Sequence, residues 1–441
     1  MRPIGIDLFA GAGGMSLGFE QAGFDVVAAV EIDPIHCAVH EFNFPSAKVL
    51  CRSVVGLTGA EIRIKAGLGN RPVDVVFGGA PCQGFSLIGQ RAFDDPRNGL
   101  VRDFLRIVQE LDASYFVFEN VKGLTVGKHK AFLEELIAAA GDAGYDVRLK
   151  WQVLDAADYG TPQHRQRLFL LGAKKGLPVP VYPDKLTVPA DKAIGQRTEL
   201  AIGPSCEDAL ADLPDAEKFK SLLETDEVTT SAWGDPSEYA KEMRGLTNSA
   251  WHFGHVREWK PGLLTSSART NHTAISVRRF ADTAPGQVEP ISRFFKLAPD
   301  GLSNTLRAGT DAARGAFTSP RPIHYKYNRC VTVREMARLH GYPDWFRFHE
   351  TKWHGARQIG NSVPPPLARA VAGEVLKAMD LEPVVPEGTM KLGRTALLRM
   401  GMAEASDYFR VEAPIGKRDR KSGAKKRKQH EIEAERLQAI G

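Results

Sequence analysis

One glycine-rich turn constrains this chain more than any other feature. It reads Gly78-Gly79-Ala80-Pro81-Cys82-Gln83-Gly84-Phe85-Ser86 and follows the apolar run Val73–Phe77, which predicts a buried strand of a parallel sheet. Ligands and reactive groups gather where such strands end. The proline stiffens the backbone before the cysteine, and the glycines let another molecule approach closely. A free cysteine also behaves as a small hydrophobe, so the turn by itself leaves a structural thiol as an alternative.

The N-terminal 175 residues predict the fold class. Strand signals occur at 4–9, 26–30, 73–77, 115–118, 147–154 and 168–171, and helix signals at 15–22, 100–111 and 131–140. This alternation predicts an α/β fold with a doubly wound, mostly parallel, Rossmann-like sheet. From about 176 to 330 the pattern fails, which predicts an inserted, smaller, loop-rich domain. Helix signals return at 333–339 and 367–379.

Composition narrows the class of protein. The 441 residues suggest about two or three domains, and no apolar run reaches the roughly 18 residues of a membrane span. The N-terminus lacks a signal-peptide pattern. The five cysteines are scattered without Cys-x-x-Cys spacing, so we expect neither disulfides nor zinc, and a cytoplasmic location. His252 and His255 have no third ligand of suitable spacing, and no metal site is predicted.

The net charge of +5 is unevenly distributed. Residues 417–428 carry eight basic side chains and one acidic, whereas 199–244 carry twelve acids and four bases. Segment 257–329 has twelve bases and five acids, which favours a surface that contacts phosphates. A solvated charged face is the alternative.

The first strand ends in a turn typical of nucleotide sites. Gly11, Gly13 and Gly14 permit close backbone approach, and Glu31 ends the second strand, where its carboxylate can accept the hydroxyls of a ribose. The spacing is not G-x-G-x-x-G, so a ligand without phosphates on its ribose is favoured. S-adenosyl-L-methionine meets that description.

Two further polar groups follow strands. Glu119 and Asn120 come directly after an apolar strand and should lie near Cys82 at the carboxyl edge of the sheet, although a surface acid is the alternative. In the extended segment 163–167, alternation places Gln163, Arg165 and Arg167 on one face.

Six segments in order resemble motifs of the C5-cytosine-specific DNA methyltransferase family. They are Asp7–Gly14, Pro81–Gln83, Glu119–Val121, Gln163–Arg167, Arg334–Pro343 and Gln358–Pro364. The resemblance covers about residues 4–175 and 303–378. One departure is visible: the acid that family members usually carry after the third strand is replaced here by Arg52-Ser53-Val54, which puts cofactor affinity in doubt rather than the reaction type.

The resemblance implies a fold of the S-adenosylmethionine-dependent methyltransferase type and a DNA (cytosine-5)-methyltransferase. Because C5 of cytosine is a poor nucleophile, the Cys82 thiolate is expected to add at C6 and so activate C5. Glu119 would share a proton with N3, Asn120 would hold the loop, and Arg165 and Arg167 would supply positive charge. The target base must be flipped out of the duplex.

The expected binding residues fall into two groups. The cofactor set is Phe9, Gly11, Gly13, Gly14, Glu31, Ile32, Ser53, Pro81, Leu100, Asn361 and Val363, in which Phe9 and Ile32 sandwich the adenine. The DNA set is Gln83, Ser86, Arg91, Arg97, Arg269, Arg278, Arg279 and Arg307, the first four on a flap that closes on DNA.

The resemblance also implies a discontinuous catalytic domain. We expect residues 1–184 as its first part, 185–345 as the target-recognition domain, 346–385 as the returning part and 386–441 as an extension with a basic tail. The expected partner is double-stranded DNA, with the chain acting as a monomer in a restriction–modification system, or as a solitary methylase. The endonuclease of such a system would form no stable complex with it.

Three alternatives stay open on the sequence. A tRNA methyltransferase of the same family is disfavoured by the long middle region and the missing Cys-Phe-Thr. A DNA-binding relic without activity would be expected to lose Cys82 or Glu119. A nicotinamide-dependent oxidoreductase is disfavoured by the glycine spacing.

Overall fold

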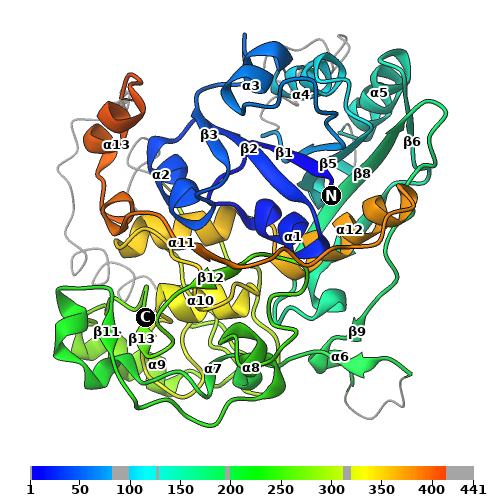
Figure 1. Ribbon diagram of the computed structural model, residues 1–441. Coiled ribbons are helices and arrows are strands. Elements are labelled where there is room, and N and C mark those ends of the chain that lie inside the picture. Colours follow the sequence, from blue (N-terminus) through cyan, green and yellow to red (C-terminus); the bar gives the residue numbers. More distant parts are fainter. Residues whose placement is uncertain (1, 82–98, 126–128, 194–198, 311–318, 414–441) are drawn as a thin grey trace, which may run out of the picture.

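A twisted eight-stranded sheet lies at the centre of one part of the molecule, with helices around it (Figure 1). The computed structural model describes residues 2–81, 99–125, 129–193, 199–310 and 319–413. Within them the sheet has the order β3-β2-β1-β4-β5-β8-β6, and β7 also pairs with β8. Its strands are β1 (Ile4–Leu8), β2 (Asp25–Glu31), β3 (Lys48–Cys51), β4 (Val75–Gly78), β5 (Tyr115–Val121), β6 (Tyr145–Val147), β7 (Gln152–Asp155) and β8 (Gln166–Lys174).

The strand directions confirm the predicted doubly wound fold. Strands β1 to β5 are mutually parallel, and β8 runs antiparallel to β5. The chain builds β1, β2 and β3 outward and then returns to β4 on the other side of β1. In sheets of this kind, ligands bind beyond the carboxyl ends of the strands where the order reverses, and we call this region beyond β1 and β4 the crevice.

Helices cover both faces of the sheet (Figure 1). One face carries α1 (Gly14–Ala22) and α12 (Pro365–Ala378), and the other carries α3 (Gly59–Lys65), α4 (Gly99–Glu110) and α5 (His129–Asp142). The ring of Phe19 in α1 stacks on Phe77 of β4 with centroids 3.7 Å apart. On the opposite face Phe104 of α4 makes an edge contact with Phe118 of β5. Both layers are therefore anchored on the strands that lead to the crevice.

The remaining elements are short and separated by long connections. They are α2 (Pro34–Asn43), β9 (Thr187–Val188), α6 (Ala190–Ala193), β10 (Ala201–Ile202), α7 (Cys206–Leu210), β11 (Val228–Thr229), α8 (Glu238–Met243), β12 (Val256–Glu258), β13 (Leu263–Leu264), α9 (Ala274–Asp282), α10 (Val333–Leu339), α11 (Lys352–Asn361), β14 (Thr389–Lys391) and α13 (Met402–Phe409). Strand β14 pairs with β12, so the chain beyond α12 is tied to the loop-rich region. None of the helices in the described ranges is long and apolar enough to cross a membrane.

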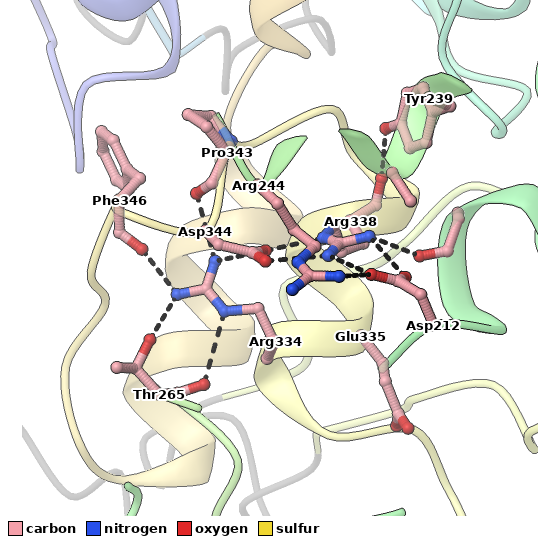
Figure 2. A network of polar contacts seen from close by, with 12 residues as sticks. Asp212, Tyr239, Arg244, Thr265, Arg334, Glu335, Arg338, Pro343, Asp344 and Phe346 are labelled. Atoms are coloured by element: carbon pink, nitrogen blue, oxygen red, sulfur yellow. Dashed lines mark hydrogen bonds and ion pairs between the residues drawn. The ribbon is translucent and has the colours of Figure 1, made fainter. Parts of the chain in front are cut away.

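Helix α10 is fully buried although it carries two arginines (Figure 2). The Arg338 guanidinium forms ion pairs with Asp344 at 2.6 Å and with Asp212 at 3.1 Å. Arg334 donates to the Thr265 hydroxyl at 2.7 Å and to the Phe346 carbonyl at 2.7 Å. A buried charge is tolerated only when it is paired and hydrogen-bonded, which these contacts achieve.

One strand of the sequence prediction is wrong. Residues 147–154 were expected to form a single strand, but they contain the end of β6, an irregular stretch and most of β7. The Arg148 side chain donates to the Pro180 carbonyl at 2.9 Å, and Leu149 is 68% exposed. The chain therefore leaves the sheet at Arg148 and re-enters it at Gln152. Helices α2 and α3 were not predicted, and strand β3 was implied only by the family resemblance, as the strand before Arg52.

We expect Arg338→Ala to lower the free energy of unfolding by about 3–5 kcal/mol, because it leaves Asp212 and Asp344 buried without their shared cation. Urea denaturation would measure the loss. As a control, Arg399→Ala removes the exposed partner of Glu350 and should change the stability by about 1 kcal/mol or less. Equal effects of the two variants would contradict the structural role of Arg338.

Candidate active site

The end of β4 and the residue after it lie close to β1 on one side and β5 on the other, and two glycines make this possible. A Cβ on Gly78 would lie 2.0 Å from the Leu8 carbonyl oxygen, and one on Gly79 would lie 2.3 Å from Oε2 of Glu119. Any larger residue would displace the backbone or the carboxylate. Cys82 follows three residues later and lies outside the described residues, as do the expected DNA contacts Gln83, Ser86, Arg91 and Arg97.

Glu119 is a buried carboxylate that faces an arginine. Arg167 Nε lies 2.7 Å from Glu119 Oε1, and both side chains are 12% exposed. Burial raises the pKa of Glu119, while Arg167 and Arg165 oppose the shift only in part. The group is therefore easier to protonate than an ordinary glutamate, which suits a carboxyl that shares a proton with a bound base.

Asn120 ties the two strand ends together. Its Nδ2 donates to the Ala80 carbonyl at 2.9 Å, and its Oδ1 accepts from the Val121 N–H at 2.9 Å. Ala80 stands two residues before Cys82, so this amide fixes the backbone from which the cysteine segment departs. The loop-holding role that the family resemblance implies for Asn120 stays a prediction.

Arg165 is almost fully buried and connects distant parts of the chain. Its two terminal nitrogens donate to the Leu306 carbonyl at 2.9 Å and the Gly360 carbonyl at 2.7 Å. Its Nε finds no hydrogen-bond partner in the part of the chain that the structure describes. Burial lowers the pKa of Arg165 to about 9, with Arg167 adding to the shift. The sequence indicated positive charge here but not this bridging role.

The residues before Arg165 fasten the same junction. Gln163 accepts from the Leu306 N–H at 3.0 Å and lies 2.9 Å from Nδ1 of His340. His164 lies between two carboxylates, with Nδ1 3.0 Å from Asp155 and Nε2 2.9 Å from Asp191. Because carboxylates only accept hydrogen bonds, both ring nitrogens must carry protons. The sequence gave no role to His164, since neither partner lies beside it in the chain.

The turn after β1 holds a carboxylate in place beside open space. Gly11 N–H donates to Glu31 Oε2 at 2.9 Å, and the N–H groups of Ile32 and Asp33 donate to Oε1 at 2.9 and 2.8 Å. A Cβ on Gly11 would meet nothing within 4 Å. Ile32 is 63% exposed, and Phe9 is half-buried with a φ of 63°. Each oxygen of Glu31 keeps capacity to accept from a ligand hydroxyl.

The chain's later part returns to this turn. A Cβ on Gly14 would lie 2.5 Å from the Val363 carbonyl oxygen, so the first and last motifs touch through backbone. Gly13 has a φ of 99° and packs against the Phe44 ring. Asn361 is exposed at the end of α11 and Val363 is buried. Gly14 and Val363, two of the expected cofactor residues, are therefore in backbone contact.

The other expected cofactor residues lie at the edges of this region. Ser53 Oγ accepts from the Val55 N–H at 3.1 Å and remains half-buried. Leu100 is half-buried against the core beneath α4, and Pro81 is exposed.

Asp7 is a buried acid that the sequence motif contains without a stated role. Ser16 Oγ donates to Asp7 Oδ2 at 2.6 Å and lies 3.0 Å from Nε2 of His40. Burial raises the pKa of Asp7 to about 8 against the hydrogen bond from Ser16, and the nearby Glu31 adds to the rise. Burial lowers the pKa of His40 to about 3. The contacts among Asp7, Ser16 and His40 thus connect β1, α1 and α2, the elements around the turn after β1.

The expected DNA-contacting arginines differ in their surroundings. Arg278 on α9 and Arg307 are exposed. Arg279 lies 3.5 Å from Glu289, and Arg269 donates weakly to the Phe219 carbonyl at 3.4 Å. Arg307 directly follows Leu306, whose carbonyl accepts a hydrogen bond from Arg165.

Comparison with known proteins decides the family. Residues 4–377 match the model of the C-5 cytosine-specific DNA methylases. The chain is 58% identical over 414 residues to type II methyltransferase M.XorII of Xanthomonas oryzae pv. oryzae, covering 94% of both chains. The chain belongs to the C-5 cytosine-specific DNA methylases. This methylase is also 34% identical to type II methyltransferase M1.HphI of Haemophilus parahaemolyticus, over 84% of this chain and 86% of that protein.

A solved structure agrees with the assignment. It is described as a DNA modification methyltransferase encoded within an E. coli prophage, and it matches with a TM-score of 0.67 and 32% identity. The match covers 86% of the methylase and all of that chain. The sequence-based family prediction and the predicted reaction class, DNA (cytosine-5)-methylation, are confirmed.

We expect Gly79→Ala to lower kcat of the methylase by about 100-fold, because the new methyl group displaces the Glu119 carboxylate on the scale of 1 Å. Single-turnover methyl transfer would measure this, and the melting temperature would report on folding. Gly373→Ala is the matched control, since its Cβ would meet nothing within 4 Å. Unchanged turnover in Gly79→Ala would show that Glu119 needs no fixed position.

A second prediction concerns pH. The hydrogen bond to Asp155 raises the pKa of His164 to about 9, with Asp191 contributing and burial opposing. The folded pKa lies above the ordinary value of about 6.5, so the stabilisation is fully present below pH 6.5 and is lost as pH rises through 9. We expect His164→Gln to destabilise the protein by about 1–2 kcal/mol at pH 6, a figure reduced for partial exposure, and by much less at pH 10. Urea denaturation of wild type and His164→Gln between pH 6 and pH 10 tests this prediction. If the difference in stability between the two proteins stays constant over this range, His164 does not form charged contacts with Asp155 and Asp191.

Proposed function

We propose that this methylase transfers a methyl group from S-adenosyl-L-methionine to C5 of a cytosine flipped out of duplex DNA, with Cys82 as the nucleophile. The observation that carries the assignment is the pairing of Glu119 with Arg167 beside the Ala80 backbone, which leads directly to Pro81 and Cys82. Nucleophile and proton-sharing acid thus leave neighbouring strand ends of the same crevice.

The residues around the β1 turn fit S-adenosyl-L-methionine. Three backbone N–H groups donate to the Glu31 carboxylate, and its oxygens can still accept hydrogen bonds from the two ribose hydroxyls. Phe9 and Ile32 would flank the adenine, and Ser53, Pro81 and Leu100 would close the pocket. Gly11, Gly13, Gly14, Asn361 and Val363 would line the remainder. The bound cofactor supplies an electrophilic methyl group next to the target carbon.

Glu119 and the arginines would prepare the cytosine for attack. The raised pKa of Glu119 lets it hold or share a proton at N3 as the Cys82 sulfur adds at C6. A carboxyl at this place also recognises the exocyclic amine, which favours cytosine over thymine. Arg167 fixes the carboxyl through its 2.7 Å contact, and Asn120 fixes the cysteine loop.

The domain division follows from this assignment. We propose that residues 1–184 and 346–385 form the catalytic domain, that 185–345 form the target-recognition domain and that 386–441 form an extension. DNA would bind between the catalytic domain and the target-recognition domain. The relatives named type II methyltransferases support a role as the modification enzyme of a restriction–modification system. We propose a monomer that acts on chromosomal DNA in the bacterial cytoplasm without stably binding an endonuclease.

The test uses duplex DNA in which target cytosines are replaced by 5-fluorocytosine. We expect wild type to form a covalent complex that survives denaturation, since fluorine cannot leave as a proton does. Cys82→Ser should form no such complex and transfer no methyl group while still binding the cofactor. Cys206→Ala, which removes a buried thiol in α7, should behave as wild type if folded.

Bisulfite sequencing of host DNA would then identify the target sequence. Labelling of tRNA but not of duplex DNA by methyl-tritiated cofactor would overturn the proposed substrate. Turnover retained in Cys82→Ser would overturn the proposed nucleophile.

A further inference from the structure

The chain beyond α12 packs against the elements of the cofactor site, although the match to the family model does not reach it. That match covers residues 4–377, and the structure describes the chain as far as residue 413. In this last stretch β14 pairs with β12, and α13 lies beside α2 (Figure 1). We call residues 389–409 the brace. Helix α2 begins shortly after the expected cofactor residues Glu31 and Ile32, so contacts of the brace with α2 matter for cofactor binding.

The brace is attached to the last turns of α2 at two points. The Gly393 N–H donates to the Phe42 carbonyl at 2.8 Å. A Cβ on Gly393 would lie 2.7 Å from the Phe42 Cα, so the two backbones are in direct contact. Further along the chain, the Tyr408 hydroxyl donates to Glu41 Oε1 at 2.5 Å.

Apolar packing continues from the brace to the turn after β1. Leu397 and Leu398 lie in a short 3₁₀-helix near the middle of the brace, and each is 2% exposed. They form one packed cluster with Val39 of α2 and with Ala12, which is 1% exposed. Because protein interiors are close-packed, a void at either leucine is felt by its neighbours in the cluster.

The turn after β1 and the start of α2 together fix the proposed ribose-binding carboxylate. Ala12 directly follows Gly11, whose N–H donates to Glu31 Oε2 at 2.9 Å. Asp33 caps α2 by accepting from the Ile35 N–H, and its own N–H donates to Glu31 Oε1 at 2.8 Å. Each oxygen of Glu31 is therefore held by an element that packs against the brace.

A separate set of contacts connects the brace to the segment before α11. The Glu350 N–H donates to the Leu398 carbonyl at 3.0 Å. His349 Nδ1 accepts from the Thr351 N–H at 3.1 Å, so the ring proton is on Nε2, which donates to the Met400 carbonyl at 3.1 Å. These hydrogen bonds fix the backbone of the brace on the side of the leucines that α2 does not reach.

From this packing we infer that the brace positions the turn after β1 and the Glu31 carboxylate for S-adenosyl-L-methionine, with Leu397 and Leu398 as positioning residues. They act through Ala12 and α2. The inference rests on the proposed function, because it assumes that the cofactor binds between this turn and Glu31. A brace that only stabilised the fold would leave the cofactor affinity of the folded protein unchanged.

The test is the dissociation constant of S-adenosyl-L-methionine, measured by calorimetry on the full chain without DNA. We expect Leu398→Ala to raise this constant by about tenfold, because the void lets the turn and Glu31 shift from their binding positions. At saturating cofactor kcat should stay within about twofold of wild type, so that the loss appears in KM for the cofactor. Leu398→Met nearly conserves the side-chain volume and should bind the cofactor almost as wild type does.

Leu376→Ala is the matched control. Leu376 is 3% exposed near the end of α12, next to Gly23, and lies in a different packed cluster from Leu398. Its truncation should lower the melting temperature about as much as Leu398→Ala does and leave the dissociation constant unchanged. Should Leu398→Ala fail to fold, Leu398→Val makes a smaller void and should raise the constant by about threefold.

The outcomes separate the brace from the proposed function. Wild-type affinity in the folded alanine or valine variant of Leu398, or an equal loss of affinity in Leu376→Ala, would overturn the positioning role. The proposed function stands in either case if wild type methylates duplex DNA. If wild type binds no S-adenosyl-L-methionine, the proposed function fails, and the inference on the brace fails with it.

Discussion

The buried guanidinium of Arg165 is the contact on which the arrangement of the active site depends. It approaches the sheet with β8, yet its hydrogen bonds go to carbonyls of Leu306, in the loop-rich region, and Gly360, at the end of α11. Carbonyls offer no full charge in return, so burial dominates and lowers the pKa of the arginine. A neutral side chain of similar shape has too few donors to join three segments at one point.

This junction explains how motifs as far apart in the chain as those beside β8 and α11 come together. The Gly14 turn meets the Val363 carbonyl only because α11 and α12 return to the sheet, and Arg165 fixes where α11 ends. Gln163 adds a hydrogen bond to Leu306, and His164 adds one to Asp155. The candidate active site is therefore assembled by contacts between segments far apart in sequence, while each motif supplies only its own turn.

The sequence predicted the sheet and the motif-bearing turns well, because strand periodicity, glycine spacing and local order are local properties. It predicted that Glu119 would lie near the turn after β4 for the same reason. It did not predict the contact of His164 with Asp191 or that of Ser16 with His40, because folding brings these partners together from separate parts of the chain. The strong negative charge of 199–244 is likewise explained only in three dimensions: Asp212 and Asp226 face arginines of the segment 338–347.

Arginine serves opposite purposes in this molecule, and the difference lies in the partner rather than in the residue. On α10 it is enclosed by carboxylates and carbonyls, which satisfies its donors inside the protein and leaves nothing for a ligand. Near the end of α11, by contrast, Arg307 is exposed and Arg357 lies over the Trp353 ring, and neither forms an ion pair with another described residue. A count of charges along the sequence cannot distinguish the buried, paired arginines from the exposed ones, because it gives every arginine the same weight. The position of each arginine relative to buried acids therefore decides whether its charge is paired inside the protein.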